Sequence, residues 1–277
     1  MRLSVVIPTK NEEANIGNCL GAFVDFVKTG QSRFDKIELI VVDNFSSDRT
    51  REIAAEAGAK VFLQGPERCA QRNRGWREAT GEVVMFVDAD MIVPEATLRE
   101  IENGKSRIEN ESGGKLCLYI PEVRAGKGLR IKARNFERSF YDGTVIDGLR
   151  VIPRALLEAV GGYDEKLVAC EDWDLDRRLK AAGAVTAITK GHLIHNEARQ
   201  NFRKFLAKKA YYSKSVEFYR EKWRDGITAK QFGFGYRYFG VFTENGKWKK
   251  LVRHPVLAAV MYSERIAVGA TFLLKRN

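Results

Sequence analysis

Short apolar stretches with the composition of β-strands alternate with helical stretches over the first 90 residues of this chain. The strand-like stretches lie at residues 3–7, 37–42, 61–63 and 83–87. Such an alternation is typical of βαβ units, in which each helical crossover returns the chain to the same end of a parallel sheet. We therefore predict an α/β fold with a Rossmann-like, mixed, mainly parallel sheet that is flanked by helices.

Helical periodicity and capping residues define the segments between and after these strands. Apolar residues at spacings of three and four predict a helix over 12–28, and Ser46, Ser47 and Asp48 supply N-cap chemistry for a helix over 51–57. Further helices are expected at 69–79, 94–108, 155–160 and 172–182, and a further strand at 116–123. Residues 124–148 are interpreted as loop and helix. With 277 residues, 44% of them apolar, the chain can bury a substantial core.

The strand at 83–87 runs directly into two carboxylates, Asp88 and Asp90. In an extended chain, residues two apart project to the same side, so both can reach one cation or its ligand. Carboxylate oxygens suit Mg²⁺ or Mn²⁺, which usually bridge protein carboxylates to substrate phosphates. The ordinary alternative is a strand that ends in a polar turn, where Asp is common.

Two other strands of the predicted sheet also end in polar residues. The first ends in Pro8, Thr9, Lys10, Asn11 and Glu12, and the second ends in Asp43 and Asn44. In open α/β sheets, ligands bind beyond the carboxyl ends of the strands. The three strand ends therefore predict one shared crevice.

The ordered set of motifs resembles the family 2 glycosyltransferases, which adopt the GT-A fold. The resemblance covers about residues 3–197. It rests on residues 4–13 (SVVIPTKNEE), 41–50 (VVDNFSSDRT), 71–75 (QRNRG), 79–82 (ATGE), 86–90 (FVDAD), 161–165 (GGYDE) and 171–172 (ED). Two departures are Asn44-Phe45, where many members have a shorter turn with Gly, and Met91, where polyprenyl-phosphate sugar synthases often have Leu-Gln.

The resemblance implies a UDP- or GDP-sugar donor and a divalent cation, Mn²⁺ or Mg²⁺. The implied donor-binding residues are Pro8, Thr9, Asn11, Glu12, Asp43, Arg72, Asp88 and Asp90, and the implied metal site contains Asp90, Asp88 and His195. Asp90 would ligate the metal directly, whereas Asp88 would contact ribose or metal-bound water. Arg72 could equally be a solvated helix charge, and His192 competes with His195.

The resemblance also implies a catalytic base and an inverting, single displacement. An attacking hydroxyl must lose a proton to a carboxylate within hydrogen-bond reach. Asp172 resembles the family's base, and Glu171, Trp173 and Asp147 are expected on the acceptor side. In isolation, an Asp at a helix start is also an ordinary N-terminal stabiliser.

The charge of the chain is concentrated in its C-terminal part. Residues 199–253 contain fifteen Lys and Arg against four acids, a net charge of +11, which equals that of the whole chain. The same stretch holds 14 of the 29 aromatic residues and predicts a helix over 199–225. Basic residues interleaved with aromatics suit an anionic membrane surface or single-stranded nucleic acid, or form an ordinary solvated helix face. We predict a glycosyltransferase domain at 1–198 and a helical C-terminal extension at 199–277.

Residues 255–274 have about the length that spans a bilayer, but Glu264 and Arg265 lie at the centre of the segment. Each would cost about 2.5–3.5 kcal/mol at the bilayer midplane, so we expect a helix in the membrane interface or one packed on the domain. Four scattered cysteines and no apolar leader favour a cytosolic protein, peripheral on the cytoplasmic face of the membrane.

These observations favour a metal-dependent, inverting glycosyltransferase whose hydroxyl acceptor is lipid-linked or membrane-proximal. A transferase that acts on a soluble glycan or protein is the first alternative. A non-catalytic nucleic-acid-binding protein that uses the basic segment is the second, and nucleic acid is the less expected partner.

Overall fold

A computed structural model describes the whole chain except residues 31, 33, 105–112, 145, 197–214 and 275–277. The strands are β1 (Arg2–Thr9), β2 (Lys36–Asp43), β3 (Lys60–Leu63), β4 (Val83–Phe86), β5 (Met91–Ile92), β6 (Leu116–Tyr119), β7 (Glu122–Arg124), β8 (Leu149–Pro153), β9 (Val185–Ile188) and β10 (Leu193–His195). The helices are α1 (Ile16–Lys28), α2 (Thr50–Glu56), α3 (Arg68–Glu78), α4 (Glu95–Asn103), α5 (Leu129–Arg138), α6 (Arg154–Val160), α7 (Glu171–Ala181), α9 (Gly226–Phe232), η2 (Tyr236–Gly240), α10 (Val241–Thr243), η3 (Glu244–Gly246), α11 (Trp248–Arg253) and α12 (Pro255–Leu274).

A seven-stranded sheet in the order β3-β2-β1-β4-β8-β6-β9 forms the centre of the molecule. Its strands pair in parallel except β8, which is antiparallel to both β4 and β6. A smaller sheet, β5-β10-β7, lies beside it. The prediction of a mixed, mainly parallel sheet flanked by helices is thus confirmed.

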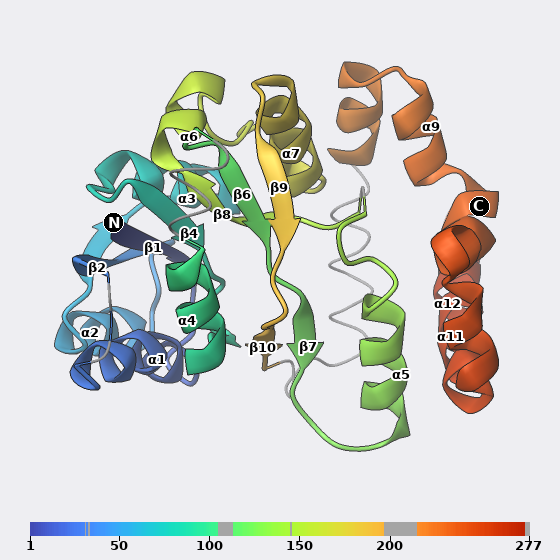
Figure 1. The fold of residues 1–277 in the computed structure, drawn as a ribbon, viewed down its shortest axis with the longest axis horizontal. Coiled ribbons are helices and arrows are strands. Elements are labelled where there is room, and N and C mark those ends of the chain that lie inside the picture. The colour runs from blue at the N-terminus through green and yellow to red at the C-terminus, as the bar shows by residue number, and fades with distance from the viewer. Residues whose placement is uncertain (31, 33, 105–112, 145, 197–214, 275–277) are drawn as a thin grey trace.

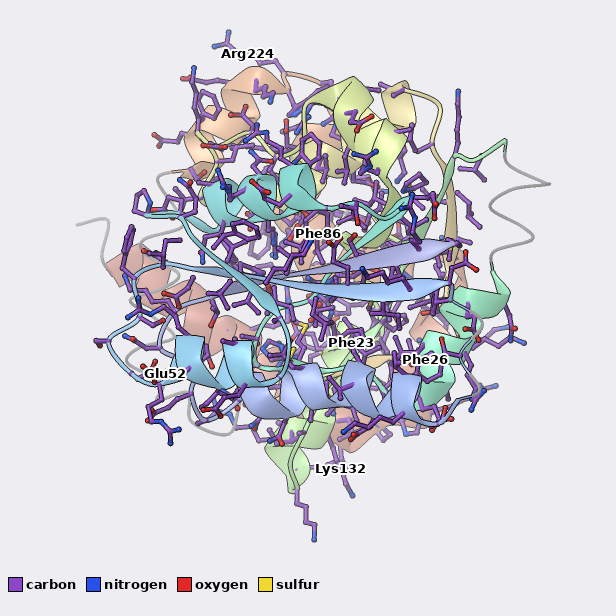
Figure 2. All side chains as sticks on the ribbon, turned by 90° about the vertical axis from the view of Figure 1, so that its left-hand side faces the viewer. Phe23, Phe26, Glu52, Phe86, Lys132 and Arg224 are labelled. Carbon is purple, nitrogen blue, oxygen red and sulfur yellow. The ribbon has the colours of Figure 1, made fainter. Side chains whose placement is uncertain are left out.

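Helices cover both faces of the large sheet and enclose two apolar cores (Figures 1 and 2). Phe23 and Phe26 of α1 lie on one side of the sheet and Phe86 lies on the other, as Figure 2 shows. The first core includes residues of α1, α2 and α4, and the second includes residues of α3, α6 and α7. The polar residues that follow β1, β2 and β4, such as Asn11, Asn44 and Asp88, are not part of these cores.

Besides strands β5, β9 and β10, which were not predicted, the structure differs from the expected elements in three places. The strand expected at 116–123 is two strands, β6 and β7, which belong to different sheets and are separated by Ile120 and Pro121. Proline has no N–H for a ladder, so it ends the first strand there. Strand β8 was not predicted, and the helix expected at 94–108 ends at Asn103, with 105–112 outside the described residues.

The C-terminal helices form the edge of the molecule opposite α1 and α2 (Figure 1). A third apolar core joins α12 and α10 to α5. The expected boundary at 198 and most of the expected helix over 199–225 lie outside the described residues, but residues 215–222 are helical. That helix ends before Asp225, whose carboxylate caps α9 by accepting from Thr228 N at 2.9 Å. In the described parts of the chain, no helix combines the length and the apolarity that a bilayer crossing requires.

Helix α3 approaches β1 and β2 closely because Gly75 has no side chain. A Cβ at Gly75 would lie 2.2 Å from Val6 Cγ1 and 3.3 Å from Val42 Cγ2. Both valines are fully buried, so neither can move without disturbing the core. This approach brings the side chains of Gln71 and Arg72 to the strand ends.

We expect Gly75→Ala to lower the free energy of unfolding by about 1–3 kcal/mol, because the added methyl group overpacks the core. Chemical denaturation measures the change. Gly21→Ala in α1 is the matched control, since nothing lies within 4 Å of its added Cβ and alanine favours a helix by up to about 1 kcal/mol. Equal stability of the two variants would contradict this packing.

Candidate active site

The first two strand ends are joined by hydrogen bonds around Asp43, which is fully buried. Its carboxylate accepts from Ser46 N at 2.7 Å and from the Ser46 hydroxyl. Asn11 has a positive φ of 54°, which Asn tolerates better than most residues. Its backbone N–H donates to Ser46 Oγ at 2.8 Å, and its side-chain oxygen accepts from Ser47 N at 2.9 Å. These bonds fix a small polar turn beside both strand ends.

Residues next to this turn provide groups for a ligand. Gln71 Nε2 donates to the carbonyls of Thr9 at 2.9 Å and Val42 at 2.6 Å, which ties the two strand ends together. Pro8 and Thr9 are buried, and Thr9 Oγ1 has no hydrogen-bond partner among the described residues. A buried hydroxyl without a hydrogen-bond partner lowers the stability of the fold unless a ligand or a water molecule supplies the missing hydrogen bond.

Glu12 follows the turn and faces the Asp-x-Asp segment. Its backbone N–H donates to Thr50 Oγ1 at 2.8 Å, and its carboxylate accepts from Asn15 Nδ2 at 2.7 Å. Burial, together with the charges of Asp90, Asp48 and Asp88, raises the pKa of Glu12. The first strand end and the Asp pair therefore share one electrostatic environment.

Arg72 is the centre of a buried ion network beneath these strand ends. Its side chain is 1% exposed, so the alternative of a solvated helix charge is wrong. Its Nη2 donates to Asp88 Oδ1 at 3.1 Å, and its Nη1 donates to Asp172 Oδ1 at 2.9 Å. One guanidinium thus joins the end of β4 to the start of α7.

Three arginines surround the carboxylate of Asp88. Arg150 Nη1 lies 3.8 Å and Arg68 Nη1 lies 4.0 Å from Asp88 Oδ2, in addition to the bond from Arg72. Burial raises the pKa of Asp88, but the three guanidinium charges outweigh burial and hold that pKa well below its usual range. Asp88 is therefore ionised at neutral pH.

Asp90 and His195 face each other at the corner between the two sheets. Asp90 Oδ2 lies 3.0 Å from His195 Nε2, and the other ring nitrogen lies 3.9 Å from Glu122 Oε2. Asn196 N donates to the carbonyl of Asp90 at 2.8 Å, which holds the end of β10 in place. His192 is exposed, and its carbonyl accepts from Thr97 Oγ1. No group of three potential metal-binding side chains is found in the described part of the chain.

Asp90 and His195 are in direct contact at hydrogen-bond distance, and both side chains are of types that bind divalent cations. Ligand atoms at about 2.1 Å from a cation and at right angles to each other are about 3.0 Å apart. Asp90 Oδ2 and His195 Nε2 are separated by this distance. Mg²⁺ and similar cations normally complete their shell with waters and substrate phosphates. The donor set therefore fits a cation site that opens toward a ligand.

The residues expected on the acceptor side surround Asp172. A Cβ at Gly148 would lie 3.1 Å from Asp172 Cβ, so the turn before β8 lies against the candidate base. Asp147 is 2% exposed and accepts from Gly148 N and Arg138 Nη2. Trp173 Nε1 donates to the carbonyl of Ile146 at 3.0 Å. Asp147 and Trp173 thus fix the turn that borders Asp172.

Sequence reasoning missed four charged residues of this network: Arg68, Glu122, Arg138 and Arg150. Arg150 bonds to Glu122, and Arg138 Nη2 lies 3.5 Å from Glu122 Oε1. With them the network contains four guanidiniums and six carboxylates: Arg68, Arg72, Arg138 and Arg150 with Asp88, Asp90, Glu122, Asp147, Glu171 and Asp172. The available signal was Arg150, a charge inside the apolar run 149–153. The excess of carboxylates suits a cation.

Glu171 is a buried network carboxylate whose pKa is raised. Its side chain is 7% exposed, and Arg68 and Arg72 lie 3.7 Å away. Burial and the adjacent Asp172 charge raise the pKa of Glu171 from 4.5 to about 6, against the opposing effect of the two arginines. The folded state therefore holds this proton more tightly than the unfolded state, so the stabilisation is complete below about pH 4.5 and is lost as the pH rises through about 6.

We expect Glu171→Gln to be more stable than the natural protein at about pH 7.5 by up to about 2 kcal/mol, because the amide carries no charge. The difference should vanish near pH 4.5. Urea denaturation across this range measures it, with the exposed Glu56→Gln in α2 as control. A stability difference that does not change with pH would contradict the raised pKa.

Comparisons of sequence connect this geometry to known proteins. Residues 4–104 match glycosyl transferase family 2. The probable glycosyltransferase YdaM of Bacillus subtilis is 28% identical over 205 residues, which cover 66% of this chain and 47% of that protein. The dolichol-phosphate mannosyltransferase of Pyrococcus furiosus is 33% identical over 172 residues, which cover 59% and 45%. The matched part thus spans less than half the length of these relatives.

Solved structures share the fold. The mannosyltransferase PcManGT of Pyrobaculum calidifontis, in complex with GDP-Man and Mn²⁺, has a TM-score of 0.60 at 19% identity, covering 98% of this chain and 80% of that one. TarS 1-349 of Staphylococcus aureus, in complex with UDP-GlcNAc, has a TM-score of 0.55 at 17% identity, covering 99% and 92%. Together with the sequence match, they show that residues 4–104 form a glycosyl transferase family 2 region and that the chain has the GT-A fold.

Proposed function

We propose that this protein transfers a sugar from a UDP- or GDP-sugar to a hydroxyl group, with inversion at the anomeric carbon. The observation that carries the proposal is the Arg72 bridge, which brings Asp88 of the donor side and Asp172 of the acceptor side to one guanidinium. Asp90, two residues after Asp88 in the chain, lies 3.0 Å from His195. A donor diphosphate and an acceptor hydroxyl require such a pair of adjoining sites.

The first two strand ends are assigned to the nucleoside. Asp43 accepts hydrogen bonds only, so it suits the N–H groups of a nucleobase. Thr9 Oγ1 is buried without a partner among the described residues and gains one from a bound nucleotide. Asn11 and Glu12 complete this side, while Arg72 faces the diphosphate side through its bond to Asp88.

Asp90 and His195 are assigned to a divalent cation, Mn²⁺ or Mg²⁺. Such a cation supplies positive charge next to the diphosphate leaving group. Glu122 lies beyond His195, and a carboxylate in this position orients an imidazole ligand. Burial raises the pKa of Glu122, but Arg150 and Arg138 outweigh burial and lower it to about 2, so its charge persists.

Asp172 is assigned as the base. The acceptor oxygen forms its bond to the anomeric carbon as the bond to the diphosphate oxygen breaks, and the hydroxyl proton passes to Asp172. The bond from Arg72 holds the Asp172 carboxylate in position. Gly148, which lies next to Asp172, has no side chain that would block access to this carboxylate. No covalent sugar-enzyme intermediate is needed for a single displacement.

The acceptor is assigned to a hydroxyl compound that is lipid-linked or membrane-proximal. Named relatives include a dolichol-phosphate mannosyltransferase and a poly(ribitol-phosphate) β-N-acetylglucosaminyltransferase. A soluble glycan or protein acceptor is the second candidate. The matches to family 2 do not support the alternative of a non-catalytic nucleic-acid-binding protein.

The release of UDP or GDP from a panel of sugar nucleotides in the presence of Mn²⁺ tests the proposal, with water or an added acceptor as the nucleophile. We expect Asp172→Asn to lower kcat by about 10²–10⁴, because the amide cannot take the proton. The dissociation constant of UDP or GDP, measured by calorimetry, should stay near that of the natural protein. Asp25→Asn on the exposed face of α1 is the control. Failure of every sugar nucleotide to react would overturn the proposal.

We expect His195→Gln and Asp90→Asn each to weaken Mn²⁺ binding more than about tenfold, since each removes one of the two protein ligands. The electron paramagnetic resonance signal of free Mn²⁺, followed in a titration with UDP present, measures Mn²⁺ binding without any turnover. His192→Gln, three residues away and exposed, should bind Mn²⁺ like the natural protein. Equal losses in the two histidine variants would place the cation elsewhere.

A further inference from the structure

Helix α12 turns its two charged residues toward the body of the protein. Arg265 pairs with Glu137 of α5, and its Nη1 donates to the Tyr141 hydroxyl at 2.7 Å. Glu264 accepts from Arg130 Nε, also on α5, at 2.7 Å. The charges that argue against a membrane span are thus neutralised on the inner side of the helix.

The outward side of α12 has no charge over its described residues. Besides Pro255 at its first position, its exposed residues are Val256, Ala259, Ser263, Ile266 and Ala267, and the spacings of these five place them on one stripe. Val256 is 62% and Ile266 is 64% exposed. Ser263 satisfies its hydroxyl within the helix by donating to the Val260 carbonyl.

Helix α11 continues this surface with a mixture of apolar and basic residues. Trp248 is 50% and Val252 is 69% exposed, and Lys249 and Arg253 are exposed beside them. The helix contains no acid. We call these four residues of α11, together with the stripe on α12, the C-terminal outer face.

Aromatic residues of the η2 region lie beside α12. Phe234 is 69% exposed and stacks on Tyr238 with ring centroids 4.5 Å apart. The Tyr238 hydroxyl reaches the Arg265 carbonyl of α12. The η2 segment thus packs on the Arg265 side of α12, and Phe234 adds exposed aromatic surface beside it.

We propose that the C-terminal outer face binds the surface of an anionic lipid bilayer. Exposed apolar groups rimmed by Lys and Arg match such a surface in both respects, since the apolar groups enter the headgroup boundary and the cations meet anionic lipids. A second copy of this chain is the less suitable occupant, because the positive charges of Lys249 and Arg253 would repel their counterparts across a two-fold axis.

The segment that contains α11 is linked to the proposed acceptor side of the candidate active site through residues 138–140. Lys247 Nζ donates to the Phe140 carbonyl at 2.6 Å, and Lys250 Nζ donates to the Ser139 carbonyl at 3.1 Å. Next to these residues, Arg138 bonds to Asp147, which precedes Gly148 and Asp172. Membrane binding would place this turn near the bilayer, which suits a lipid-borne acceptor hydroxyl; this consequence rests on the proposed function.

Flotation of the full chain with phosphatidylcholine vesicles, with and without phosphatidylglycerol, tests the proposal. We expect binding to the anionic vesicles at low salt and release at about 1 M NaCl, where screening is strong. Val252→Asp/Ile266→Asp should lower the partition coefficient at least about tenfold, as should Lys249→Glu/Arg253→Glu. Val27→Asp/Val185→Asp, at positions 49% and 48% exposed, and Lys28→Glu/Lys36→Glu are the matched controls.

Three outcomes would overturn the proposal: no binding of the natural protein to anionic vesicles, equal losses in face and control variants, or a dimer that dissociates in Val252→Asp/Ile266→Asp. Light scattering reports the last. UDP or GDP release with water as nucleophile should be unchanged in the face variants, because these residues are remote from the strand ends (Figure 1). Lost flotation with intact nucleotide release thus separates this proposal from the proposed function.

Discussion

The buried guanidinium of Arg72 is the interaction on which the rest of the site depends. A guanidinium that is 1% exposed is stable only if carboxylates compensate for its lost hydration, and Asp88 and Asp172 do so at 3.1 and 2.9 Å. Removing one partner of such a pair typically costs about 3–5 kcal/mol. Arg72 thereby fixes the relative position of α3, β4 and α7, and with them the distance between Asp88 and Asp172.

The C-terminal helices hold α7 from its other side. Lys222 Nζ and Trp223 Nε1 each lie 2.8 Å from Asp174 Oδ1, and Arg177 binds Asp225 at the start of α9. Trp173 packs against Tyr219 and Phe232. The basic segment therefore does more than carry charge, because it also supports the helix that presents the candidate base.

Much of the fold and part of the site could be predicted from local pattern. The βαβ alternation defined the parallel strands, and the polar residues at their ends identified Asp43 and the Asp88–Asp90 pair before any geometry was known. The pairing partners could not be predicted, because Arg150 and Glu122 meet only after β8 inserts between β4 and β6. A short strand with no periodicity of its own gives no local signal for such an insertion. Likewise, only packing on α5 shows that the charges of α12 face inward.

The most direct test of the account is the position of Mn²⁺ in crystals grown with Mn²⁺ and UDP or GDP, located by its anomalous scattering. The account predicts an anomalous peak within bonding distance of Asp90 Oδ2 and His195 Nε2, with the diphosphate oxygens between that peak and Arg72. A peak bound by other side chains, or a diphosphate placed away from Arg72 and Asp88, would contradict it.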